Sequence, residues 1–113
     1  MNRPGTQTEL ETVPIQQLAS VIRSKNAGPF WVSVDIMCDT REQFERLRDS
    51  GQFDRHKIAR LYNLSSRRIS EIIFFEPGLA ITFNIRRRKP AGSPGDRDMY
   101  GAQYYVPILQ LRA

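Results

Sequence analysis

Phe30-Trp31-Val32-Ser33-Val34-Asp35-Ile36-Met37 is the stretch that decides the fold of this 113-residue chain. Its apolar residues occupy every second position, and Trp31, Ser33 and Asp35 stand between them. A period of two is typical of a strand that buries one face. The stretch therefore predicts a strand, and the face that carries Trp31 is either internal or covered by a helix, a partner or a ligand.

Two short amphipathic helices are expected directly after this strand. Thr40 followed by Gln43 forms a capping-box pattern, which predicts a helix over 41–49 that Gly51 ends. Asp54 can cap a second helix, in which apolar side chains again share one face. Ser65 or Ser66 is expected to cap a single further turn.

The second half of the chain carries the signals of a hairpin and a final strand. The pattern predicts strands over 71–76 and 79–86, with Pro77-Gly78 as the tight turn between them. Residues 104–111 are expected to form a last strand, with Pro107 at an edge or a bulge. Strands at both ends and helices between them indicate an α+β fold, an antiparallel sheet with helices on one face.

The length fits one domain, and we expect a single α+β domain over 13–113. Residues 1–12 are expected to form a flexible tail. No run approaches the roughly 18 apolar residues of a membrane span, and the first residues lack a secretory signal pattern. The cytoplasm is therefore the expected compartment. Cys38 is the only cysteine, which excludes an internal disulfide and a multi-cysteine metal site. Phosphate-binding glycine patterns are absent, and no cofactor or metal is predicted.

The formal net charge is +5, but most of the positive residues are interspersed with acidic ones, which is typical of solvated helix faces. The exception is the run Arg86-Arg87-Arg88-Lys89, which either serves an anionic ligand or partner or marks a strand that ends in water. Nucleic-acid binding needs basic residues gathered on one face among aromatic ones, and the dispersed charge disfavours it.

Two polar turn segments, 24–29 and 92–103, hold most of the residues that could meet a ligand, and we interpret them as one candidate site. Arg23 and Lys25 could neutralise a carboxylate or phosphate. Asp96 and Asp98 could form a cation site or an acid–base pair, or could simply form the turn. The phenol of Tyr100 could donate to an oxyanion or anchor the loop.

Three stretches also resemble a known family: residues 22–30, the turn Phe74-Phe75-Glu76-Pro77, and residues 92–103. They are similar to the signatures of the proteins called domain of unknown function 4387. That family in turn resembles the small ferredoxin-like domain of acyclic terpene utilisation proteins. The resemblance implies a ferredoxin-like antiparallel sheet of about four to five strands with two helices on one face. It also implies a strand over 15–22, where the spacing of the apolar residues alone predicts a short helix.

The resemblance further implies a site and a role. Its site residues would be Arg23, Ser24, Lys25, Asn26, Gly28, Ser93, Gly95, Asp96, Asp98, Tyr100 and Gln103. The catalytic candidates among them are Lys25, Asp96, Asp98 and Tyr100. The protein would be an accessory subunit or domain that partners a larger protein related to those of acyclic terpene utilisation. It would help bind a carboxylate or acyl-thioester in a lyase or hydratase step. The alternative is a self-sufficient homo-oligomer that is either an enzyme or a protein that binds a small molecule, for which an anionic ligand is expected. A nucleic-acid binder ranks behind both.

Overall fold

The chain folds into one four-stranded antiparallel sheet and two α-helices. The computed structural model describes residues 12–88, 91–92, 94, 101 and 104–113. The strands are β1 (Val21–Asn26), β2 (Trp31–Met37), β3 (Ile73–Phe75) and β4 (Ala80–Arg86), and they lie in the order β1-β2-β4-β3. The helices α2 (Arg41–Asp49) and α3 (Arg55–Leu61) lie between β2 and β3 in the chain. The predicted α+β fold is confirmed.

The ferredoxin-like detail of that prediction is not confirmed. The described elements run β-β-α-α-β-β along the chain, whereas a ferredoxin-like fold runs β-α-β-β-α-β. Each half of this sheet is instead a hairpin, β1 with β2 and β3 with β4, and the two hairpins join through the pairing of β2 with β4.

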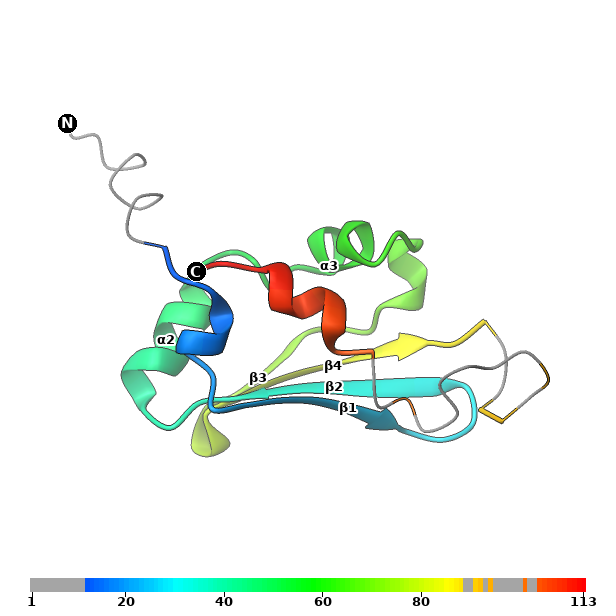
Figure 1. Cartoon of the computed structure of the whole chain (residues 1–113), viewed down its shortest axis with the longest axis horizontal. Coiled ribbons are helices and arrows are strands. Elements are labelled where there is room, and N and C mark those ends of the chain that lie inside the picture. Colours follow the sequence, from blue (N-terminus) through cyan, green and yellow to red (C-terminus); the bar gives the residue numbers. More distant parts are fainter. Residues whose placement is uncertain (1–11, 89–90, 93, 95–100, 102–103) are drawn as a thin grey trace.

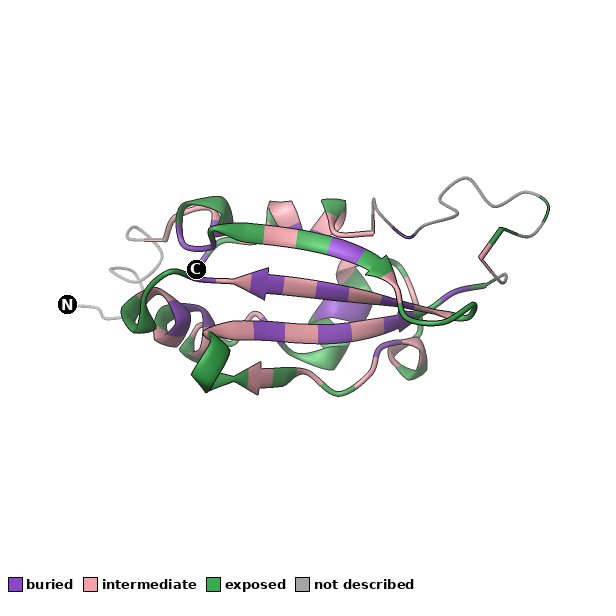
Figure 2. Ribbon diagram, turned by 90° about the horizontal axis from the view of Figure 1, so that it is seen from below, coloured by how far each residue is buried: buried purple, intermediate pink, exposed green. Residues whose placement is uncertain are grey.

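Both α-helices lie on the same face of the sheet, as Figure 1 shows. Besides α2 and α3, this layer contains two short 3-10 turns, η1 (Ile15–Gln17) and η4 (Val106–Gln110). The alternation expected for β2 is confirmed, because every second residue of β2 and β4 is buried beneath that layer (Figure 2). The fully buried large side chains are Ile15, Val32, Val34, Ile36, Phe44, Leu47, Ile58, Ile69, Ile81, Phe83, Ile85 and Ile108.

The predicted caps begin the helices as expected. The Thr40 hydroxyl accepts from the backbone N–H of Gln43 at 3.2 Å, and the Gln43 side chain accepts from the N–H of Thr40 at 3.3 Å. Asp54 accepts from two N–H groups in the first turn of α3. Ser65 likewise caps a single 3-10 turn, η2 (Ser66–Arg68). Each cap satisfies N–H groups that no helical carbonyl can reach.

The predicted hairpin over 71–86 is confirmed with narrower bounds. β3 covers only Ile73–Phe75, and Pro77-Gly78 lies within a 3-10 turn, η3 (Glu76–Gly78). Leu79 then adopts a left-handed conformation with φ 52° before β4 begins.

The final strand predicted over 104–111 is wrong. Residues 106–110 form the 3-10 turn η4, with Pro107 in its first positions and Ile108 fully buried in the core. Proline has no N–H to give to a strand ladder, and burying Ile108 requires the chain to turn over the sheet. Only an isolated bridge between Pro14 and Arg112 remains, beside the paired hydrogen bonds of Val13 with Ala113.

Both predictions for residues 15–22 are wrong over most of the segment. Ile15–Gln17 form one 3-10 turn instead of a helix through Ile22, and β1 begins at Val21 instead of near residue 15. Ile15 and Leu18 are buried against the core, after which the N–H of Ser20 donates to the carbonyl of Met37 and joins the sheet. Packing of the turn thus ends the helical pattern early.

None of the described residues belongs to a helix that is long and apolar enough to cross a membrane.

Candidate functional site

The first predicted segment lies on β1 and in the loop that follows it, and the strand divides its side chains between two faces. Ser24 pairs with the buried Val34 and is itself 7% exposed, so it points into the helix-covered side, as does Asn26. Arg23 and Lys25 alternate with them along the strand and point to the uncovered side. The four predicted site residues on β1 therefore form two pairs on opposite faces of the sheet instead of one group.

The six predicted residues of the second segment lie outside the described residues: Ser93, Gly95, Asp96, Asp98, Tyr100 and Gln103. Their described neighbours contact the first segment at several points. The N–H of Ala91 donates to the carbonyl of Pro29 at 2.7 Å, and the N–H of Tyr105 donates to Ser24 Oγ at 3.1 Å. The residues that flank the second segment thus lie against the first segment, at the end of the sheet that carries the β1–β2 loop.

Gly101 makes the closest approach between the two segments. It is buried, has φ +70°, and a Cβ placed on it would lie 2.9 Å from Asn26 Oδ1 and 3.1 Å from the backbone nitrogen of Asn26. Only a residue without a side chain fits there without displacing Asn26. Glycine is therefore required at this position for the two segments to pack together.

Arg87 was predicted only as part of the basic run 86–89, and not as one of the site residues. It is only 4% exposed, its Nη1 donates to Asn26 Oδ1 at 3.0 Å, and its guanidinium lies 5.4 Å from the centre of the Tyr104 ring. A signal existed, because Arg87 continues the inward phase of Ile81, Phe83 and Ile85 on β4. We call Ser24, Asn26, Arg87, Gly101 and Tyr104 the loop junction.

The remaining cations of the basic run take other positions. Arg86 lies on the uncovered side, 5.7 Å from the ring centres of both Phe30 and Trp31. Arg68 donates to the carbonyl of Arg86 at 3.0 and 2.5 Å, and burial, followed by the charge of Arg88, lowers the pKa of Arg68. Positive charge therefore gathers at the same end of the sheet as the loop junction, which favours an anion there.

The uncovered side of the sheet carries a second polar group, centred on Asp35. Its Oδ1 accepts from Thr82 at 2.7 Å and from Ser33 at 3.4 Å, and its Oδ2 lies 3.6 Å from Arg23 Nε. We call this side the open face, and its residues are Val21, Arg23, Lys25, Trp31, Ser33, Asp35, Met37, Ile73, Phe75, Ala80, Thr82, Asn84 and Arg86. Asp35 is satisfied by its neighbours, which favours a structural role for it.

A comparison with protein families assigns the chain. The family model described as "Domain of unknown function (DUF4387)" matches residues 15–112. The chain belongs to this family. No curated protein and no solved structure matches it significantly. The DUF4387 match covers both polar segments and every element of the sheet, so the loop junction and the open face both lie within the family domain.

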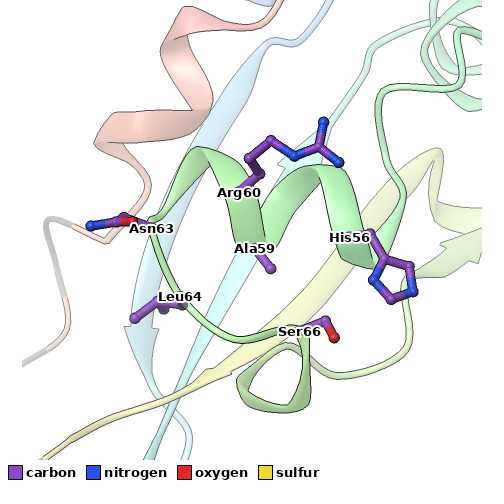
Figure 3. A pocket seen from close by; sticks show the side chains of 6 residues that line it. All are labelled: His56, Ala59, Arg60, Asn63, Leu64 and Ser66. Atoms are coloured by element: carbon purple, nitrogen blue, oxygen red, sulfur yellow. The ribbon is translucent and has the colours of Figure 1, made fainter.

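A shallow pocket of about 400 Å³ lies beside α3 of the DUF4387 domain, lined by His56, Ala59, Arg60, Asn63, Leu64 and Ser66. Figure 3 shows that the polar tips of Arg60 and Asn63 point away from each other. His56 is exposed, in agreement with its place on a surface helix. Within the described parts of the chain, no group of three His, Cys, Asp or Glu residues could hold a metal ion. The loop junction is therefore the better candidate site.

Proposed function

We propose that this DUF4387 protein is a cytoplasmic accessory subunit that helps a larger protein bind a carboxylate or acyl-thioester ligand. The larger protein would resemble those of acyclic terpene utilisation, and the complex would act in the catabolism of such acids. The observation that supports the proposal most is the loop junction, where Asn26 of the first segment and Tyr104, just after the second, lie against the buried guanidinium of Arg87.

The charge at this end of the sheet supports an anionic ligand. Arg68, Arg86, Arg87 and Arg88 approach it from two segments of the chain, and the pKa of Arg68 is lowered by burial and by Arg88. Crowded guanidinium groups repel one another, and a bound carboxylate or phosphate relieves that repulsion through charge-assisted hydrogen bonds. Gly28, which has φ +91° and open space around its Cβ position, leaves the β1–β2 loop accessible at the same end.

The layers of the fold support an accessory role. Both α-helices cover the same face of the sheet, and large apolar side chains remain exposed on the other face, among them Ile73 at 52% and Phe75 at 54%. Exposed apolar residues that gather on one face are typical of an interaction site. A chain with a second, larger subunit over that face would bury them.

Native mass spectrometry of the untagged protein, taken gently from its own cells, tests the subunit role. We expect a heteromeric mass that contains one larger chain in fixed ratio. A purely homomeric mass would contradict the proposal and would favour the self-sufficient alternative, in which the chain binds its ligand without another subunit.

Calorimetric titration with acetate and with acetyl-coenzyme A tests the ligand class. We expect the heteromer to bind one of these probes and the isolated chain to bind neither. Asn26→Ala removes the acceptor of Arg87, so it should weaken binding about tenfold, which corresponds to about 1.4 kcal/mol. Gln17→Ala, at an exposed amide in η1, is the control and should leave the affinity unchanged. Equal affinities of the two variants would contradict the assignment of the site.

A further inference from the structure

We infer that the open face is the docking surface for the larger subunit, and that the surface of that subunit facing it is apolar with flanking carboxylates. This inference rests on the proposed function, because it names the place where the accessory chain would bind its partner.

One end of the open face is an apolar row that crosses the whole sheet. The strand register places Val21 beside Met37, Met37 beside Ala80, and Ala80 beside Phe75. Val21 is 41% exposed and Phe75 is 54% exposed, and Ile73 next to this row is 52% exposed. Contiguous apolar surface on a sheet face loses its contact with water when a second layer packs against it. The row therefore provides the apolar part of an interface.

The rest of the open face carries an excess of positive charge. Arg23, Lys25 and Arg86 lie on it with a single carboxylate, Asp35, which already pairs with Arg23. Lys25 has no ion pair with any residue that the structure describes, and it lies beside Ser33. A partner that supplies carboxylates opposite Lys25 and Arg86 would be electrostatically complementary.

The same charges argue against a second copy as the occupant. A two-fold interface is self-complementary, so it would place the open face of one chain against that of another. Three cations and one carboxylate would then face an identical set, and like charges across an interface are destabilising. The rings of Trp31 and Phe30 already stack with Arg86, which leaves them poorly placed to stack with nucleic-acid bases. An acidic protein surface is the occupant that fits.

Zero-length carbodiimide cross-linking of the native heteromer tests the inference, because it joins a lysine amine only to a carboxylate in direct contact. The chain has three lysines: Lys25 on the open face, Lys57 on α3, and Lys89, which lies outside the described residues. We expect peptide mapping to find Lys25 joined to Asp or Glu residues of the larger chain. An intact heteromer whose cross-links leave from Lys57 alone would overturn the inference.

Matched variants give a second, independent measurement. Ile73 and Val106 are exposed to similar extents, 52% and 48%, but Ile73 lies on the open face and Val106 lies in η4 on the covered side. Ile73→Asp and Lys25→Glu should each weaken the heteromer at least tenfold, measured by the dissociation of native complexes on dilution. Val106→Asp and Lys57→Glu should leave it unchanged, and circular dichroism checks that each variant is folded.

The possible outcomes separate this inference from the proposed function. A heteromer that tolerates both Ile73→Asp and Lys25→Glu would overturn the docking face and leave the accessory role standing. Homomers alone, with Lys25 joined to a carboxylate of a second copy, would overturn both. Binding of a fluorescent single-stranded oligonucleotide by the isolated chain, lost in Lys25→Glu, would overturn the inference in favour of nucleic acid.

Discussion

Replacing Gly101 by alanine should loosen the contact between the two polar segments. The new methyl group would lie 2.9 Å from Asn26 Oδ1, 3.1 Å from the Asn26 nitrogen and 3.1 Å from a methyl carbon of Val32. Two of these neighbours are backbone or buried side chain, so they cannot move aside cheaply. Gly101 also has φ +70°, a backbone conformation that residues other than glycine rarely adopt.

The magnitude follows from two contributions. The left-handed backbone costs a residue with a Cβ about 1 to 2 kcal/mol. Forcing a methyl group into a filled space costs about 1 to 3 kcal/mol. Gly101→Ala should therefore lower the free energy of unfolding by about 2 to 5 kcal/mol, a large share of the roughly 5 to 15 kcal/mol of a typical domain. The corresponding fall in Tm is about 8 °C or more.

Urea unfolding followed by circular dichroism measures the effect, and Gly28→Ala is the matched control. Gly28 also has a positive φ, +91°, but a Cβ there would meet nothing within 4 Å. Gly28→Ala should thus show the backbone contribution alone, about 1 to 2 kcal/mol. Equal destabilisation by the two variants, or an effect of Gly101→Ala within about 0.5 kcal/mol, would refute the close packing of Gly101 on Asn26.

Three further predictions concern the covered side. Thr40→Ala removes the capping-box hydroxyl that accepts from Gln43, and chemical denaturation should show a loss of about 1 kcal/mol. Tyr62 donates to the carbonyl of Tyr104, and burial raises the pKa of its phenol. The folded state therefore holds this proton more tightly than the unfolded state, so stability should fall as the pH rises above about 10, and Tyr62→Phe should flatten that part of the stability profile. Cys38 is buried and its thiol pKa is raised by that burial, so an aromatic disulfide reagent should react with it at least about a hundredfold more slowly in the native protein than in urea.

Several elements were predictable because their signals are local. The alternation of β2, the caps at Thr40 and Asp54, and the Pro77-Gly78 turn each depend on residues within a few positions of one another. Caps and turns satisfy backbone groups in their own segment, so their energetics are almost independent of the rest of the molecule. The sequence motifs at 22–30 and 92–103 also indicated the family that the comparison confirms.

The candidate site was predictable only in part. Its first segment was identified, but the period of two along β1 places Ser24 and Asn26 on one side and Arg23 and Lys25 on the other. That separation follows from the strand β1, which begins at Val21. The apolar spacing of residues 15–22 predicted a helix there and so obscured the start of the strand. Whether the predicted residues of the second segment join the site stays a prediction, because they lie outside the described residues.

The amino-acid sequence by itself determined the family, the α+β class and the elements whose caps, turns and alternation are written within a few residues. Tertiary structure decided the rest. The segments that contain Ile15 and Ile108 form 3-10 turns, and these turns bury both side chains in the core. This packing overrides the weak local preference of short segments. Arg87 is buried because Asn26 and Tyr104, far away in the sequence, come together around it. The alternation of β4 indicates that Arg87 points inward, but the partners that it meets there depend on the packing of the whole sheet.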